Sequence, residues 1–422
     1  MDIINNLIIL VFVIGYLAVA LECYIKINKT ASAILMAVFT WILLYIKKDS
    51  IEFHDHLIDL HIGDASQIIF FLLGAMTLVE LIDSHQGFKM ITNFIKTKSQ
   101  KKLIWIIAIV AFFISAVLDN LTTTIVMISI LRKLIPEGKE RRYFGATVVI
   151  AANAGGAWTP IGDVTTTMLW IKGQITSISI MKSLLLPSIF SMIVSVFLIR
   201  MKISGKVTVL KTADNSNVEP GAKTVLILGI LSLIFVPIFR YLTDLPPFMG
   251  MFIGLAVLWI VTDIMHSEYE HRTHLRVPHV LKKIDISGVL FFLAILLAIN
   301  TLEMVGILKY IALYLDRTIG NLAVISTIIG FLSAIVDNVP LVAATMGMYD
   351  LTTYPTDSSI WQMIAYAAGT GGSILIIGSA AGVALMGLEK IDFIWYLKKI
   401  SLSAFTGYVA GMALYLILNI FY

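Results

Sequence analysis

The chain has 422 residues, of which 58% are hydrophobic and only 14% charged, and its mean hydropathy is +0.91. Soluble domains carry about 25% charged residues, so this composition excludes an ordinary soluble enzyme and indicates an all-α polytopic membrane protein in a lipid bilayer. The net charge of +4 does not indicate a nucleic-acid partner, and we expect none. The single cysteine, Cys23, excludes a disulfide framework and cysteine-based metal sites.

Long apolar segments recur along the chain and predict about ten membrane crossings. The first run, Leu7–Leu21, has no basic residue before it, so we interpret it as a membrane helix and not as a signal peptide. Two of the crossings contain polar and glycine-rich breaks. The expected crossings are 6–22, 30–46, 66–82, 143–171 (interrupted), 180–200, 223–240, 247–265, 285–303, 359–387 (interrupted) and 400–420.

Two further apolar segments, 103–135 and 321–349, each contain a polar pair at their centre. The pairs are Asp119-Asn120 and Asp337-Asn338. The arms on either side of each pair are shorter than the roughly 20 residues that a spanning helix needs. We therefore expect two re-entrant hairpins in addition to the crossings.

The basic residues predict the orientation of this layout. Of the 31 lysines and arginines, 24 fall in loops on one side of it. The positive-inside rule makes that side cytoplasmic. Both termini then face outward, the first hairpin enters from the cytoplasm and the second enters from outside. We expect a multi-pass protein of the cell (inner) membrane.

An internal repeat divides the chain. The segment 113–120 aligns without gaps with 331–338, and each is followed about 35 residues later by a Gly-Gly pair. Each half has five crossings and a hairpin, and because five is odd the second half must be inverted. Inverted repeats with interrupted helices are a recurring transporter design, with the binding site at the midplane. The predicted units are a first repeat over 1–200, a cytoplasmic linker over 201–222 and a second repeat over 223–422.

The hairpin tips contain candidate ion-binding residues. A carboxylate deep in a bilayer is costly and by default indicates a functional site, so we assign Asp119 and Asp337 to ion or proton binding. Each could alternatively cap the second arm of its hairpin, and the two roles are compatible. The neighbouring side chains of Asn120, Thr122 and Asn338 complete this candidate set.

The first interrupted crossing contains a second group of candidates. Gly155, Gly156 and Pro160 prevent a continuous helix, and unpaired backbone at membrane depth lines a cavity or is buried in protein. The freed carbonyl groups lie close in sequence to polar side chains, and hard cations prefer such oxygen ligands. A packing kink, with an aspartate that only caps the next helix, is the alternative. The candidates are Asn153, Gly155, Thr159 and Asp163.

The second interrupted crossing contains Thr370 and Ser373 but no acid, so the two halves are asymmetric. Glu80 and Glu303 lie near helix ends and are candidates for a proton path, with interfacial charges as the alternative. The loop from His266 to His279 contains four histidines, which could sense cytoplasmic pH; an ordinary solvated loop is the simpler interpretation.

These motifs resemble the NhaD-type sodium/proton antiporters of the ion transporter superfamily, from about residue 30 to the end. The resemblance is carried by the segments 79–88, 118–124, 155–166 and 336–340. It implies a homodimer with a scaffold and a moving transport domain, which is an elevator-type mechanism of alternating access. It also implies exchange of Na⁺ or Li⁺ for H⁺, with no cofactor besides the transported ions.

A single carboxylate that binds either Na⁺ or H⁺ is sufficient for exchange, since burial can raise a carboxyl pKa by up to about 3–5 units. The proposed Na⁺ ligands are Asp119, Asn120, Asn153, Thr159 and Asp163. One alternative is an anion carrier for arsenite or a dicarboxylate. We expect no lysine or arginine within the membrane to pair with an anion, which is an argument against this alternative. A distant alternative is an intramembrane aspartyl protease, but Pro160-Ile-Gly-Asp163 lacks the first glycine of its Gly-x-Gly-Asp motif.

Overall fold

The computed structural model describes residues 3–47, 56–88, 99–203 and 219–421. This part of the chain consists of helices and connecting turns, without a β-strand. Within it, nine helices are long and apolar enough to cross a membrane, judged by length and composition. The chain is thus a polytopic all-α membrane protein, as its composition predicts.

The helices of the first half follow the predicted apolar segments, except that the crossing predicted over 66–82 is part of a longer helix that begins at His56. The first interrupted crossing is broken at residues 157–163, where the glycines and the proline predict the break. A short turn, α2 (Glu22–Ile25), joins the first two long helices. The remaining elements are α1 (Ile3–Ala20), α3 (Lys29–Ile46), α4 (His56–Ser84), α6 (Gln100–Leu118), α7 (Asn120–Leu134), α8 (Lys139–Gly156), α9 (Val164–Ile171) and α10 (Ser177–Arg200).

The long helices of the second half follow a similar order. Its helices are α11 (Ala222–Thr243), α12 (Pro247–His266), α14 (Ile286–Met304), α15 (Ile307–Thr318), α16 (Leu322–Leu332), α17 (Asn338–Met348), α18 (Ser359–Gly371), α19 (Ala380–Glu389) and α21 (Leu402–Phe421). The last crossing begins earlier than predicted, because α20 (Phe393–Tyr396) continues through a π-helical turn into α21. Short elements, including α13 (Val277–Val280), connect α12 to α14.

Helix α15 corrects the prediction of a loop over 304–320. Its residues Ile307, Leu308 and Ala312 are buried, whereas Tyr310 and Tyr314 are exposed. This is the apolar stripe of an amphipathic helix. The segment contains too many polar residues to count as a membrane crossing, and a search for long apolar runs therefore misses it.

The four predicted hairpin arms differ in length. Helix α6 begins three residues before the predicted arm, has 19 residues and is long enough to count as a candidate span. The other arms, α7, α16 and α17, have 15, 11 and 11 residues. Most of the predicted linker over 201–222 lies outside the described residues.

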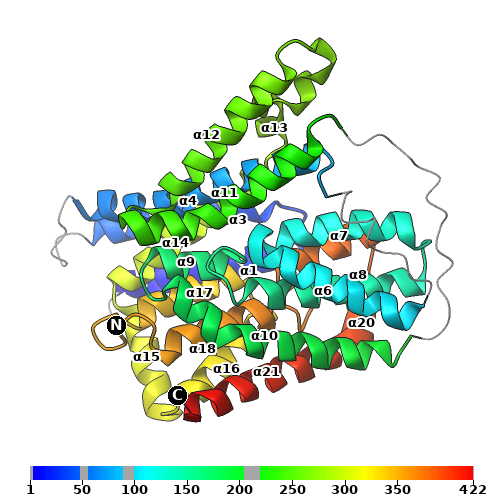
Figure 1. Ribbon diagram of the computed structural model, residues 1–422. Helices are drawn as coiled ribbons and strands as arrows, with labels where there is room; N and C mark the ends of the chain where they lie inside the picture. The colour runs from blue at the N-terminus through cyan, green and yellow to red at the C-terminus, as the bar shows by residue number, and fades with distance from the viewer. Residues whose placement is uncertain (1–2, 48–55, 89–98, 204–218, 422) are drawn as a thin grey trace.

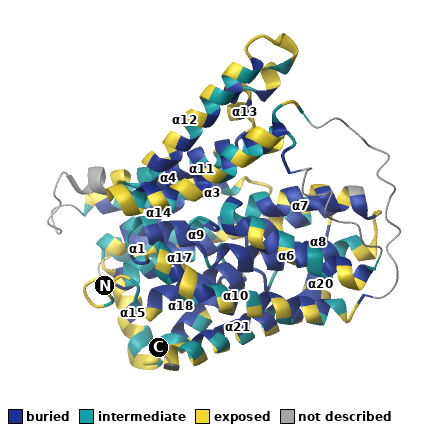
Figure 2. Ribbon diagram, in the orientation of Figure 1, coloured by how far each residue is buried: buried dark blue, intermediate teal, exposed yellow. Residues whose placement is uncertain are grey.

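The long helices pack in two matching sets. Helix α1 packs against α3 and α3 against α14, while α11 packs against α12 and α12 against α4. Helices α11, α12 and α4 lie in the upper part of Figure 1, and α10 and α21 run side by side along its lower edge. The most deeply buried helices are α8 and α18, shown mainly in dark blue in Figure 2; every residue from 143 to 156 and from 360 to 371 is buried.

The two halves meet at the centre through crossed contacts. Helix α7 packs against α19, and α17 packs against α9. Each predicted hairpin thus contacts the interrupted helix of the other half. Ser115 Oγ donates to the Ala152 carbonyl at 2.6 Å, and Ser333 Oγ donates to the Ala368 carbonyl at 2.9 Å. These two bonds have equivalent positions in the aligned halves.

The glycine pairs allow the close approach of these helices. A Cβ atom on Gly155 would lie 2.1 Å from the Phe112 carbonyl oxygen, and one on Gly371 would lie 2.2 Å from the Gly330 carbonyl oxygen. No side chain fits at either position. The first glycine of each pair is therefore required for packing between helices, in addition to breaking the helix that contains it.

Candidate functional site

A cavity of about 130 Å³ lies between the two predicted hairpins and the break of the first interrupted helix. It is lined by the tip residues of both hairpins and by Asp163. The titratable groups that line it are Lys29, Asp119, Asp163, Asp285 and Asp337. Four carboxyl groups and one ammonium group give this cavity a strong preference for cations when the acids are ionised.

Asp119 caps α7 with an unusual backbone conformation. Its φ of 95° is rare for a residue other than glycine, and such strain is common at functional sites. Its Oδ1 accepts from the Thr122 backbone N–H and its Oδ2 from the Thr122 hydroxyl, both at 2.8 Å. The carboxylate is thus fixed at the hairpin tip and faces the cavity.

Asp163 lies where both hairpin tips converge. It caps α9, with Oδ1 accepting from the Thr165 backbone N–H and hydroxyl at 2.9 Å each. Asn120 Nδ2 donates to Oδ2 at 2.6 Å, and Asn338 Nδ2 lies 3.3 Å from both oxygens. Only 1% of Asp163 is exposed. The carboxylate is therefore buried and surrounded by donors from three separate segments.

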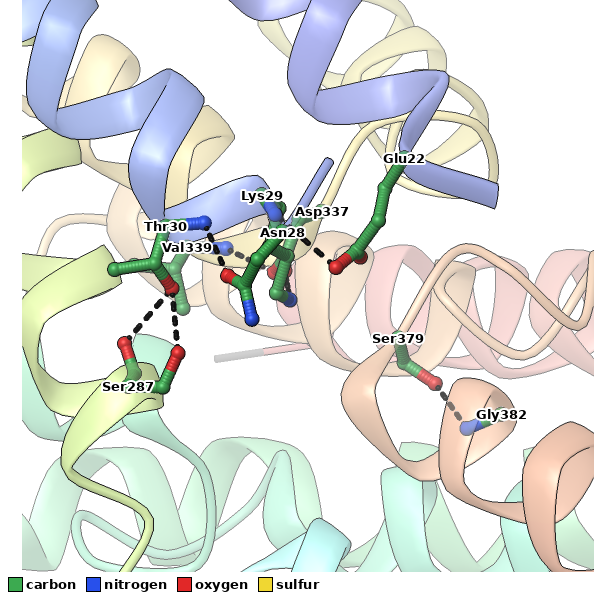
Figure 3. Close-up of polar contacts among 9 residues, drawn as sticks. All are labelled: Glu22, Asn28, Lys29, Thr30, Ser287, Asp337, Val339, Ser379 and Gly382. Carbon is green, nitrogen blue, oxygen red and sulfur yellow. Dashed lines mark hydrogen bonds and ion pairs between the residues drawn. The ribbon is translucent and has the colours of Figure 1, made fainter. Parts of the chain in front are cut away.

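Asn153 extends this network into the second interrupted helix. Its Oδ1 accepts from Asn120 Nδ2 at 3.0 Å, and its Nδ2 donates to the hydroxyls of Ser373 at 2.9 Å and Ser379 at 3.0 Å. Ser379 also caps α19 by accepting from the Gly382 N–H (Figure 3). Ser379 occupies the position that aligns with Asp163, and that alignment is the sequence signal that could have identified it as a site residue.

Five predicted site residues do not line the cavity: Asn153, Gly155, Thr159, Thr370 and Ser373. The Thr159 hydroxyl donates to the Ala116 carbonyl at 2.7 Å, and the Thr370 hydroxyl donates to the Tyr366 carbonyl at 2.5 Å. Gly155 packs against α6. The Thr159 bond thus joins the first broken segment to α6, whereas the Thr370 bond lies within α18. Asp163, Asn120 and Asn338 form the centre of the site.

Lys29 corrects the expectation that no lysine or arginine lies near the site. Its ammonium group is 3.6 Å from Asp337 Oδ2 and 4.4 Å from the centre of the Phe291 ring. The sequence places Lys29 in a loop, but it is the first residue of α3, and its long side chain reaches the cavity. Asp285, which caps α14 through the Gly288 N–H at 3.0 Å, was also missed.

The two candidate proton-path residues lie away from the central cavity. Glu80 receives a hydrogen bond from Ser84 and an ion pair from Lys283 at 3.7 Å. Glu303 is exposed and lines a second pocket together with Asp64 and Lys172. Neither glutamate lines the cavity that contains Asp163.

His266 is separated structurally from the other histidines of its loop. It is buried, whereas His271, His274 and His279 are exposed. Its Nε2 lies 3.0 Å from Nε2 of the buried His85. His85 Nδ1 lies 2.8 Å from the Leu81 carbonyl and must donate to it. In a neutral pair, His85 Nε2 is therefore the acceptor and His266 Nε2 the donor.

This pair predicts an acid-sensitive contact. Burial holds the pKa of His85 below its usual range, although the hydrogen bond to the Leu81 carbonyl and the charge of Glu219 oppose the shift. The neutral imidazole thus stabilises the fold above pH of about 6.5, and this contribution is lost as the pH falls below that value. Between pH 7.5 and 5.5 we expect the unfolding temperature in detergent to fall about 1–2 °C less in His85→Gln than in the wild type, because a given free energy shifts the unfolding temperature less in a long chain. An equal fall in both proteins, with the exposed His271→Gln as control, would contradict the assignment.

An ion in the central cavity would be held by several kinds of oxygen atom and not by a cluster of acidic side chains alone. Among the described residues, no group of three or more His, Cys, Asp or Glu side chains is placed to hold a metal ion. Carboxylate, amide and hydroxyl oxygens are nevertheless close together around Asp163. Such mixed oxygen sites suit hard monovalent cations better than tightly bound transition metals.

Comparison with known proteins places the whole chain among membrane transporters. Residues 8–363 match the family model described as citrate transporter (CitMHS). Sodium/proton antiporters 1 and 2 of Arabidopsis thaliana are 52% and 51% identical, over 96% and 98% of this chain and 71% and 99% of their own lengths. Na(+)/H(+) antiporter NhaD of Vibrio cholerae is 29% identical, over 97% of this chain and 91% of its own length.

Proposed function

Since this chain belongs to the citrate transporter (CitMHS) family, we propose that it is a secondary transporter that exchanges Na⁺ or Li⁺ for H⁺. The observation that carries the proposal is the buried Asp163 carboxylate, which the amides of Asn120 and Asn338 approach from the two hairpin tips. The names of the plant and bacterial relatives support the choice of ions. Family membership sets aside the protease alternative, because the matched family consists of transporters.

The amide groups suit a carboxylate that alternates between a cation and a proton. Asn120 and Asn338 now present their Nδ2 donors to Asp163. Rotation of an amide by 180° would present its oxygen instead, since each amide carries both a donor and an acceptor. With oxygens turned inward, Asn120, Asn338 and Asp163 would form part of a Na⁺ site. With nitrogens turned inward, they would stabilise the ionised carboxylate between transport steps.

Asp119 is the second carboxylate at this part of the cavity. Together with Asp163, it would bind either Na⁺ or H⁺. Both acids line the same small cavity, and two like charges there are unfavourable unless a cation or a proton neutralises one of them. Binding of Na⁺ and binding of H⁺ would therefore exclude each other. This exclusion couples the two fluxes without any further catalytic group.

The anion-carrier alternative is weaker although the family description names citrate. Lys29 is the only lysine or arginine that lines the central cavity in the described part of the chain, and it is paired with Asp337. Three further aspartates line the same cavity. A tricarboxylate would meet strong repulsion there, whereas a monovalent cation would be attracted.

The packing of the two halves supports an inverted repeat with two re-entrant hairpins. The hydrogen bonds of Ser115 and Ser333 match, as do the close contacts of Gly155 and Gly371. Helices α16 and α17 have only 11 residues each and α7 has 15, which is too short for a span, whereas α6 with 19 residues is long enough for one. The first repeat would cover 1–200 and the second 223–422.

We also propose an elevator-type movement of the central helices against a dimeric scaffold in the cell (inner) membrane. Helices α1, α11 and α12 are largely exposed. Within the 18-residue apolar stretch of each helix, only 6% of the residues are buried in α1 and 28% in each of α11 and α12. Such surfaces suit contact with lipid and with a second copy. The positive-inside rule would place both termini outside.

The test is a fluorescence assay in energised everted vesicles that contain the transporter. Addition of NaCl or LiCl at several pH values should release protons from the vesicle interior and restore the fluorescence of a pH-sensitive dye. KCl and choline chloride serve as controls for ionic strength and for cation selectivity. A response to none of the cations at any pH would refute the proposed exchange and favour assays of citrate, arsenite and dicarboxylate uptake.

A further inference from the structure

The exchange at Asp163 proposed above leaves the ion pair between Lys29 and Asp337 without a role. Figure 3 shows the two side chains close together at the start of α3, with Glu22 and Asn28 beside them. Lys29 Nζ is 3.6 Å from Asp337 Oδ2, and 31% and 18% of the two side chains are exposed. Both residues line the central cavity. A positive charge is thus built into a cavity that otherwise favours cations.

Several contacts fix the backbone of Lys29. Its N–H donates to Glu22 Oε1 at 3.0 Å, and the next residue, Thr30, donates its N–H to Asn28 Oδ1 at 2.8 Å. The Thr30 hydroxyl also bonds the Ser287 carbonyl at 3.0 Å, which joins α3 to α14. The Lys29 ammonium group lies over the Phe291 ring, a favourable contact for a cation. Lys29 is therefore held in place by its surroundings and is not a freely solvated surface lysine.

The equivalent acids at the two hairpin tips have different partners. Asp337 Oδ1 accepts from the Val339 N–H at 3.3 Å, while its Oδ2 faces Lys29. Asp119 uses both oxygens to accept from Thr122. No lysine or arginine of the described chain pairs with Asp119 or Asp163. The positive charge is therefore specific to the second tip.

We propose that Lys29 is a specificity-determining residue, whose tethered ammonium group neutralises Asp337 and confines cation binding to the Asp119 and Asp163 side of the cavity. This inference rests on the proposed cation/proton exchange. It explains why the second tip retains an aspartate although its half has Ser379 in place of Asp163. In this arrangement Asp337 balances the charge of Lys29 and is not a ligand of the transported ion.

Removal of Lys29 and removal of Asp337 should shift the affinities for Na⁺ and H⁺ in opposite directions. Without Lys29 the cavity has one additional uncompensated negative charge, which favours Na⁺ and H⁺ alike. Without Asp337 the ammonium group is unpaired and repels both cations. The titratable groups that share the adjoining cavities with this pair, and that would respond to the same change, are Tyr16, Glu22, Asp119, Asp163 and Asp285.

The experiment compares Lys29→Met, Asp337→Asn and the double variant in the vesicle assay. We expect the half-saturating Na⁺ concentration at the most alkaline pH to fall about tenfold in Lys29→Met, and the pH of half-maximal activity to rise by about one unit. Asp337→Asn should shift both quantities the other way. The double variant should return close to the wild type, and Lys29→Arg should resemble the wild type because it retains the charge.

The control is Lys47→Met, at the opposite end of α3, where the ammonium group bonds Asn5 at 2.7 Å. Monodisperse elution in detergent identifies variants that fail to fold, and the opposite signs of the two single variants separate a charge effect from damage. An impaired double variant would show that Asp337 is itself an ion ligand, and would overturn the inference. If the wild type exchanges cations but neither single variant shifts its Na⁺ or pH dependence, only the inference about Lys29 is overturned. If the wild type responds to no cation, the proposed exchange is refuted as well.

Discussion

Asp163→Asn is expected to abolish exchange in the everted-vesicle assay, to the level of vesicles that lack the transporter. Asparagine cannot carry the negative charge that would bind Na⁺ or the proton that would replace it. It should preserve the fold, because Asp163 caps α9 and asparagine is an equally good N-cap. The loss of activity should therefore occur without loss of folded protein, as measured by size-exclusion chromatography and thermal unfolding in detergent.

The matched control is Asp244→Asn. Asp244 is exposed and has a φ of 55°, a conformation that asparagine adopts readily, so this variant should behave like the wild type. Asp119→Asn should also lose exchange if both carboxylates share the competition. Full activity of Asp163→Asn would refute the role of this carboxylate.

Glu389→Ala is expected to have the largest effect on stability. The Glu389 side chain is 2% exposed, and its two oxygens accept from Arg132 at 2.8 Å and Arg141 at 2.7 Å. Arg132 also donates to the Leu388 carbonyl, so these contacts join α7 and α8 to the end of α19. Removing one partner of a buried ion pair costs about 3–5 kcal/mol, because the remaining charge is left uncompensated. The loss should lie at the lower end of this range, because 43% of the Arg132 side chain is exposed, whereas Arg141 is only 12% exposed. We expect a correspondingly lower unfolding temperature in detergent.

The control for Glu389 is Glu137→Ala. Glu137 pairs with the same arginine, Arg141, at 3.9 Å, but 86% of its side chain is exposed. Exposed pairs contribute about 0–1 kcal/mol, so this variant should unfold near the wild-type temperature. Similar losses in both variants would contradict the assignment of the stability to the buried contacts.

The sequence alone predicted most helices and the chemistry of the central residues. Apolar runs of membrane length identify spans, because a lipid-exposed helix must be apolar along its whole length. The break after Gly156 was predicted because glycine and proline act on the local backbone. The hairpin tips and the first interrupted crossing predicted Asp119, Asn120, Asp163 and Asn338 as candidates, and all four line the cavity.

Tertiary structure alone decided which of these groups touch and which other residues join them. Thr159, a predicted ligand, donates its hydroxyl to the Ala116 carbonyl of α6, a contact that only the packing of separate helices creates. Lys29 and Asp285 were missed because each begins a helix far from the motifs in sequence, and only packing brings them to the cavity. Helix periodicity and breaks are properties of a few adjacent residues, whereas the charge balance of a cavity depends on side chains from several helices.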